Sequence, residues 1–238
     1  MTGPFDFADL YAIAFGYRDI PREADLLLTW FDRHHGGDPA TVLELAAGPG
    51  DHALELAKRG LDATALDLSA AMCAKVGEGV RVVQADMTDF ELDQRFDLAI
   101  LMLDSASLLL TGTAMTKFLG CVGRHLTTGG LLVLDLSVGE GKPDWTIEAG
   151  GRTVRTQWGL PGDAFDPRTG IEQTRVRMTV DGIVCVDEVV GSHPWTAGQV
   201  QDLAGDGWEL VARYGSMTED IPASDLRALR DVLVLRGR

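Results

Sequence analysis

The stretch VLELAAGPGDHALELAKRG, from Val42 to Gly60, decides the fold class. Its first residues form an apolar run typical of a strand, AAGPG is typical of a tight turn, and DHALELAKRG has the spacing of an amphipathic helix. Glycines in such a turn let a ligand approach the backbone where the helix begins. The stretch therefore predicts a nucleotide-type binding site.

The same alternation continues as far as Ser137. Helical patterns separate most of five apolar runs, which are TVLELA, DATALDL, VRVVQAD, FDLAILML and GGLLVLDLS. Strands and helices in alternation predict a parallel sheet covered on both faces, with the carboxyl ends of the strands along one edge. The segment PREADLLLTWFDRHHGG predicts an amphipathic helix ahead of the sheet.

Beyond Ser137 the hydrophobic period changes to two. The stretches TIEAGGRTVRTQWGL, IEQTRVRMTV and IVCVDEVVG predict an antiparallel meander of three strands. A helix capped by Thr196 follows, and WELVARYGS and DVLVLRGR read as two final strands.

Composition narrows the classes of partner. The chain has 238 residues and a formal net charge of -15, which repels nucleic acid backbones and anionic lipid. Its cysteines, Cys73, Cys121 and Cys185, are scattered, which suits a reducing cytosol and argues against a disulfide framework or a metal site. The N-terminus has no secretory pattern and no apolar run is long enough to span a bilayer. We expect a soluble cytoplasmic protein without nucleic acid, membrane or metal partners.

Two nucleotide ligands fit the turn. Gly48, Gly50 and Ala53 can be aligned with the dinucleotide fingerprint, with Asp67 downstream. Glu44 argues against this, because a carboxylate in the strand would repel a pyrophosphate. It would instead attract a ligand that carries an ammonium and a sulfonium, such as S-adenosylmethionine. A nicotinamide-dependent oxidoreductase is therefore disfavoured.

Acidic residues at the next two strand ends agree with S-adenosylmethionine. Asp67 can accept both ribose hydroxyls, and Asp86 can accept from the adenine amine. Leu68 and Met87 can flank the purine, and the Gly48 backbone can approach the methionine part. Helix capping by Asp67 and a plain turn role for Asp86 are the structural alternatives.

The motifs VLELAAGPG, ALDLSAAM, ADMTDF, FDLAILMLDSASLLL and LTTGGLLVLDL resemble those of class I S-adenosylmethionine-dependent methyltransferases. The resemblance covers residues 8–137, and the short N-terminal segment and the insertion are most similar to small-molecule members of the glycine N-methyltransferase and amino-sugar N,N-dimethyltransferase kinds. Where that family has G-x-G-x-G, Ala46 replaces the first glycine.

The resemblance implies a Rossmann-like, doubly wound, mostly parallel seven-stranded sheet of the α/β class, with an antiparallel β insertion after the fifth strand. It divides the chain into a helical lid segment (1–38), a cofactor-binding core (39–137), the insertion (138–195) and a C-terminal helix with two strands (196–238).

The resemblance also implies a set of site residues. Tyr17 or Arg18 would hold the methionine carboxylate, with a surface role as the alternative. The expected cofactor contacts are Tyr17, Arg18, Glu44, Ala46, Gly48, Gly50, Asp67, Leu68, Asp86, Met87 and Leu103. Asp104, His193 and Tyr11 are the candidate catalytic bases. A turn or cap at the next helix is the alternative role of Asp104, and a histidine beside Pro194 is more often a plain loop residue. Asp135, at the end of the fifth predicted strand, could touch the acceptor or serve the turn.

The function expected from this resemblance is methylation of a small molecule on nitrogen, oxygen or carbon, with S-adenosylhomocysteine as the product. A secondary metabolite or amino-sugar-like compound is the expected acceptor. The alternative is a protein of this fold that keeps the cofactor but catalyses another step, such as a cyclisation; a macromolecular acceptor is a weaker option. The insertion could also pair with a second copy as a homodimer.

Overall fold

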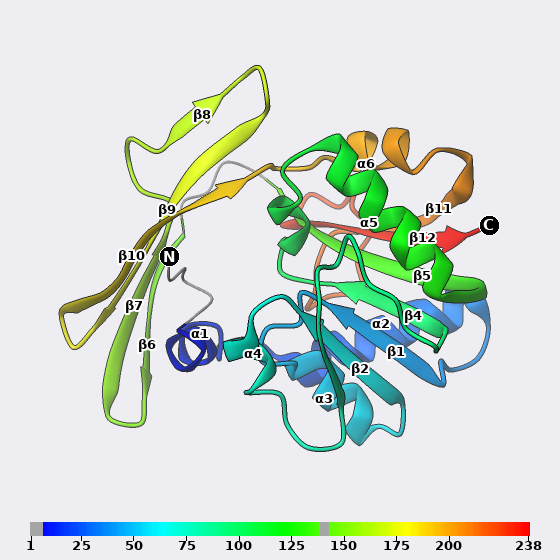
Figure 1. Cartoon of the computed structure of the whole chain (residues 1–238), viewed down its shortest axis with the longest axis horizontal. Helices are drawn as coiled ribbons and strands as arrows, with labels where there is room; N and C mark the ends of the chain where they lie inside the picture. Colours follow the sequence, from blue (N-terminus) through cyan, green and yellow to red (C-terminus); the bar gives the residue numbers. More distant parts are fainter. Residues whose placement is uncertain (1–6, 139–142) are drawn as a thin grey trace.

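The computed structural model describes residues 7–138 and 143–238. Within these ranges the strands form one seven-stranded sheet and one five-stranded sheet, with helix α1 (Ala8–Ala14) beside the smaller sheet (Figure 1).

The seven-stranded sheet has the order β11-β12-β5-β4-β1-β2-β3. Neighbours from β5 to β3 are parallel, whereas β12 runs antiparallel to β5 and β11 antiparallel to β12. The predicted mostly parallel seven-stranded sheet is thus confirmed. Its strands are β1 (Thr41–Leu45), β2 (Asp62–Asp67), β3 (Arg81–Gln84), β4 (Phe96–Leu101), β5 (Leu126–Ser137), β11 (Trp208–Tyr214) and β12 (Arg230–Gly237).

Helices cover both faces of this sheet because its strands are apolar on both sides. In β5, Leu131 and Val133 join the core cluster that contains α2 and α3, whereas Leu132 and Leu134 join the cluster that contains α5 and α6. These four helices are α2 (Ile20–His35), α3 (Asp51–Lys58), α5 (Gly112–His125) and α6 (Ala197–Ala204).

The remaining helices are short: α4 (Ala70–Cys73), η2 (Ser105–Leu108) and η3 (Gly205–Gly207). The expected cap of α6 is confirmed, since Thr196 and Gln199 form a capping box. Across the described ranges, no helix combines the length and the apolar character that a membrane span requires.

The five-stranded sheet is the predicted insertion, between β5 and α6, but it has more strands than the three expected. Gly150 and Gly151 have φ values of 61° and 74°, so the first predicted strand folds into a hairpin instead of continuing. Asp181 and Gly182, with φ of 50° and 83°, turn the last hairpin. The strands are β6 (Asp144–Ala149), β7 (Arg152–Trp158), β8 (Ala164–Asp166), β9 (Ile171–Val180) and β10 (Ile183–Ser192).

Helix α1 packs on the insertion, not on the main sheet. Its Leu10 and Ala14 share a buried cluster with Val154 and Val176 of the smaller sheet. Trp145 Nε1 also donates a hydrogen bond to the carbonyl of Ala14 at 2.7 Å. The two N-terminal helices therefore lie on different sheets, and the four-part division of the chain stays a prediction.

Candidate cofactor site

Two adjoining cavities lie at the carboxyl ends of β1, β2 and β4, where ligands bind in sheets of this kind. The larger encloses about 680 Å³, within the range of small-molecule sites. The smaller encloses about 40 Å³. Both are lined by the same four residues, Tyr11, Ala46, Gly48 and Ser105.

The turn after β1 forms the wall between the cavities. Ala46, Gly48 and Gly50 all have positive φ, at 45°, 55° and 75°. This conformation favours glycine, so the alanine at the first position of the motif is strained, although the turn still forms. A side chain on Gly48 would lie 3.8 Å from the Tyr11 ring. Gly50 lines neither cavity and precedes α3.

Asp67 faces this turn from the end of β2. Its Oδ2 accepts the amide of Gly48 at 2.7 Å, and its Oδ1 accepts the amide of Ser69 at 2.8 Å. Ser69, and not Asp67, caps the short helix α4. A carboxylate oxygen can accept more than one hydrogen bond, so Asp67 can still receive ribose hydroxyls in the larger cavity.

The other residues expected around an adenine also line the larger cavity. Leu68 is 68% exposed, a large apolar side chain that a purine could cover, and Met87 is half-buried. Asp86 is exposed, and its Oδ1 accepts from the amide and hydroxyl of Thr88, both at 2.8 Å. The turn role considered for Asp86 is therefore present, and its place in the cavity wall leaves the adenine role open.

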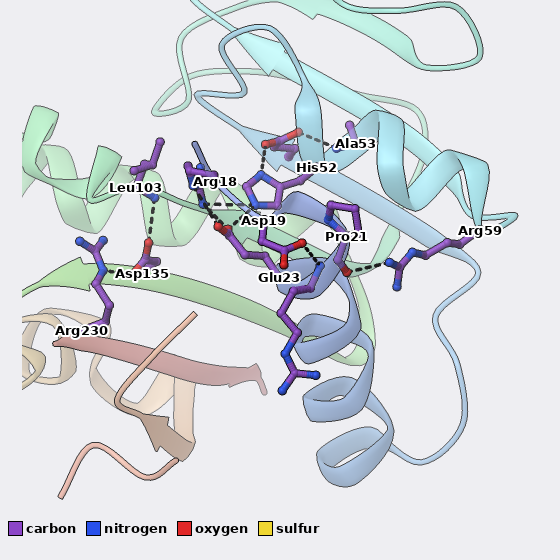
Figure 2. Close-up of polar contacts among 12 residues, drawn as sticks. Arg18, Asp19, Pro21, Glu23, His52, Ala53, Arg59, Leu103, Asp135 and Arg230 are labelled. Atoms are coloured by element: carbon purple, nitrogen blue, oxygen red, sulfur yellow. Dashed lines mark hydrogen bonds and ion pairs between the residues drawn. The ribbon is translucent and has the colours of Figure 1, made fainter. Parts of the chain in front are cut away.

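A cluster of buried charged residues forms part of the wall of the smaller cavity. Figure 2 shows the contacts within this cluster. His52 is 2% exposed, and its Nδ1 lies 3.0 Å from Oε1 of Glu44 while its Nε2 lies 2.9 Å from Oε2 of Glu23. Arg18 donates to both oxygens of Glu23, through Nε at 3.0 Å and through Nη2. Arg18, Glu44 and His52 also line the cavity.

The cluster changes the interpretation of Glu44. The sequence offered no structural partner for this carboxylate. In the structure Glu44 is 3% exposed, and both of its carboxylate oxygens have partners in the first turn of α3. Its Oε2 accepts the Ala53 amide at 2.8 Å, and its Oε1 faces His52. Sequence patterns did not indicate that His52 and Glu23 belong to the same cluster as Glu44. The position of His52 at the start of a predicted helix, near the expected cofactor site, was the only local signal.

The charge state of His52 follows from its partners. Burial lowers the pKa of His52, but the hydrogen bonds to Glu23 and Glu44 outweigh it and raise the pKa to about 9. In the same cluster, burial raises the pKa of Glu23, and the bond to His52 with the charge of Arg18 holds it below its usual value.

The candidate bases lie in different places. Tyr11 lines both cavities, and burial raises its pKa strongly, so its hydroxyl stays protonated. Asp104 and His193 line neither cavity, and neither does Tyr17, which is 58% exposed. Leu103 lines the smaller cavity, as expected of a cofactor contact.

Asp104 and His193 each contact a residue outside the two cavities. Asp104 Oδ1 accepts the amide of Ser137 at 3.0 Å, and burial raises its pKa. The ring of His193 lies 3.9 Å from that of Trp195, between centroids, and burial lowers its pKa. The structure thus brings Tyr11, but not these two residues, to the cavities.

The wall of the larger cavity formed by η2, the start of α5 and the residues between them consists of Leu108, Leu109, Leu110, Thr111 and Ala114. None of these was among the predicted site residues, and the motif FDLAILMLDSASLLL, which contains the three leucines, was their only signal in the sequence. Within residues 7–138 and 143–238, no group of three or more His, Cys, Asp or Glu side chains could hold a metal ion.

Comparison with known proteins agrees with this arrangement. Residues 42–130 match the model of a methyltransferase domain. A cypemycin N-terminal methyltransferase from Streptomyces sp is 28% identical over 114 residues, which are 46% of this chain and 46% of that protein. The match therefore spans about half the length of that curated relative.

Solved structures are similar over almost the whole chain. Streptomyces venezuelae DesVI has a TM-score of 0.80 at 19% identity, covering 97% of this chain and 98% of its own. CalS10 from Micromonospora echinaspora, an amino pentose methyltransferase solved with S-adenosylmethionine bound, has a TM-score of 0.72 at 21% identity, covering 93% and 92%. Residues 42–130 thus match a methyltransferase domain, and the chain has the fold of solved S-adenosylmethionine-dependent methyltransferases.

Proposed function

We propose that this chain transfers a methyl group from S-adenosylmethionine to a small-molecule amine, such as an amino sugar or a related secondary metabolite. The observation that carries the proposal is the pair of cavities at the carboxyl ends of the parallel strands, joined at Tyr11 and Gly48.

The residues present fit this cofactor. Asp67 would receive the ribose hydroxyls, Leu68 and Met87 would flank the adenine, and Asp86 lies at the same wall. Arg18 would face the amino-acid end in the smaller cavity, with Glu44 beside it. A negatively charged oxygen pair, an apolar slot and a guanidinium match the ribose, the purine and the carboxylate of the cofactor.

When bound, the cofactor supplies a methyl group on a positively charged sulfur. The chain's own residues orient the two reactants and exclude water, and alignment of this kind can lower a barrier by roughly 7–11 kcal/mol. Tyr11 lies at the junction of the cavities, on helix α1, which Leu10 and Ala14 anchor on the insertion.

The preference for an amine rests on the side chains at that junction. Of the three candidate bases only Tyr11 lies there, and its raised pKa keeps the hydroxyl protonated, so no phenolate is available to accept a proton. A neutral amine needs no base because its lone pair is free, whereas a hydroxyl or an acidic carbon benefits from one. The names of the cypemycin N-terminal and amino pentose methyltransferases also support an amine.

The proposal includes a cytoplasmic protein without nucleic acid partners, supported by the net charge of -15. It also includes a homodimer formed through β10, where Ile183 and Val189 are 71% and 55% exposed. Light scattering that gives only a 25.6 kDa species would remove the dimer.

The test is calorimetric titration of the purified chain with S-adenosylmethionine, S-adenosylhomocysteine and NAD in parallel. Micromolar binding of the first two without NAD binding is the expected result, and binding of NAD alone would overturn the proposal. A panel of amino sugars, peptide N-termini and phenols, assayed for S-adenosylhomocysteine release, then tests the acceptor. Turnover of phenols but of no amine would overturn the amine preference.

A further inference from the structure

The turn after β4 has an unusual backbone. Leu103 and Asp104 have φ values of 55° and 57°, so two consecutive residues other than glycine lie in the left-handed region. A residue with a side chain is sterically strained in this region. Such a conformation persists only where contacts with the surrounding structure stabilise it.

A single buried residue holds both strained positions. Asp135 on β5 is 2% exposed, and its Oδ2 accepts the amide of Leu103 at 2.9 Å. The carbonyl of Asp135 accepts the amide of Asp104 at 3.0 Å. Each strained residue therefore donates its backbone amide to Asp135, one to the side chain and one to the main chain.

Arg230, the first residue of β12, holds Asp135 in turn (Figure 2). Its Nε donates to Oδ1 of Asp135 at 2.7 Å, and its Nη1 donates to the hydroxyl of Ser137 at 2.9 Å. The carboxylate of Asp135 thus lies between a guanidinium on one side and the strained turn on the other. A charged pair that is mostly buried keeps a fixed geometry better than an exposed one.

The strained turn forms part of the cavity wall. Leu103 lines the smaller cavity together with Met102, Tyr11 and Arg18. Asp135 and Arg230 line neither cavity, so any effect on a ligand there passes through the backbone of Leu103. Strain held by a buried ion pair at the edge of a binding cavity is a form of pre-organisation.

We propose that Asp135 and Arg230 are positioning residues, which fix the Leu103–Asp104 turn as the wall of the cavity that receives the amino-acid end of the cofactor. The inference rests on the proposed function, because it assumes that S-adenosylmethionine occupies these cavities. It predicts an effect confined to one end of that ligand.

Two probes separate the ends of the ligand. S-adenosylhomocysteine has the amino-acid end, whereas 5′-methylthioadenosine has the adenosine and the thioether without it. Each is titrated calorimetrically into the wild-type chain, the Asp135→Asn variant and a matched control, Asp231→Asn. Asp231 also pairs with an arginine on a neighbouring strand, Arg213, through bonds of 2.9 and 2.6 Å, but lines neither cavity.

We expect Asp135→Asn to weaken S-adenosylhomocysteine binding by about tenfold, as for loss of one charged hydrogen bond, and to change 5′-methylthioadenosine binding less than about twofold. The Asp231→Asn control should change neither. Unchanged S-adenosylhomocysteine affinity in Asp135→Asn would overturn the inference, and so would an equal loss for both probes. If the wild-type chain binds neither probe, the cofactor proposal itself fails.

Arg230 provides the second set of variants, in case Asp135→Asn does not fold. Arg230→Gln should weaken S-adenosylhomocysteine binding selectively, and Arg230→Lys, which keeps the charge beside Asp135, should recover most of it. Binding by Arg230→Gln that equals the wild type, or equal losses in the glutamine and lysine variants, would contradict the positioning role.

Discussion

The Nδ1 of His52 lies 3.0 Å from Oε1 of Glu44, and the opposite ring nitrogen lies 2.9 Å from Glu23. Carboxylates accept hydrogen bonds but do not donate them, so both ring nitrogens must carry a proton. His52 is therefore a buried imidazolium that balances the charge of Glu44 and links Glu44 on β1 to Glu23 on helix α2.

This pair predicts a pH dependence of stability. The folded-state pKa of His52, about 9, lies above its ordinary value of 6.5. Its contribution is therefore complete below pH 6.5, declines above it and is lost as the pH rises through 9. Urea unfolding should show a fall in the free energy of unfolding between these values, of at most roughly 3 kcal/mol, which His52→Gln lacks.

His35→Gln is the matched control for that series, because His35 is exposed at the end of α2, the helix that also carries Glu23. It should follow the wild-type curve at every pH. A His52→Gln variant whose stability falls as steeply as that of the wild type from pH 6.5 to 9 would show that His52 is not the titrating group.

Asp67→Ala should weaken S-adenosylhomocysteine binding by more than about tenfold, because the charged hydrogen bonds that we propose to both ribose hydroxyls would be lost at once. The bond to the amide of Gly48, at 2.7 Å, is lost as well. Calorimetry measures the change. Asp62→Ala is the control, since Asp62 lies at the opposite end of the same strand and bonds to Gln94. Equal affinities for the two variants would contradict the ligand's placement.

Gly48→Ala should lower the free energy of unfolding by about 1–2 kcal/mol, because alanine is strained at a φ of 55°. The added methyl group would make only ordinary contacts with Tyr11 and Met72, so conformation rather than crowding is the cause. Gly198→Ala, in open space on α6, should be neutral or stabilising by up to about 1 kcal/mol. Urea melts compare the two, and a harmless Gly48→Ala would refute the strain argument.

Trp145 links α1 to the insertion, so its removal should act on the cofactor site at a distance. Trp145→Ala loses the hydrogen bond to Ala14 and the edge-to-face contact with Phe15, whose ring centroid is 5.4 Å away. Because Tyr11 lies on the same helix, S-adenosylhomocysteine affinity should fall by roughly fivefold to tenfold. Trp145→Phe should lose less, and Trp208→Ala, in the core away from α1, should show no such loss when measured by calorimetry.

The sequence by itself determined the main sheet and the edge where a ligand would lie. Apolar runs predicted its strands, and the glycines after Leu45 predicted the turn that follows β1, because positive φ values and strand periodicity are local properties of the chain. The same local signals predicted the Thr196 cap and the final two strands. They did not resolve the insertion, where Gly150 and Gly151 turned one predicted strand into a hairpin.

Only the tertiary structure decided the partners of the buried charges. His52 meets Glu23 across 29 positions of sequence, and Arg230 meets Asp135 across 95. Such pairs depend on how helices and strands pack, and a charge loses its hydration on burial, so it must find a partner wherever packing places one. Local patterns show where a carboxylate lies in a strand. The rest of the fold decides how deeply it is buried and which positively charged residue pairs with it.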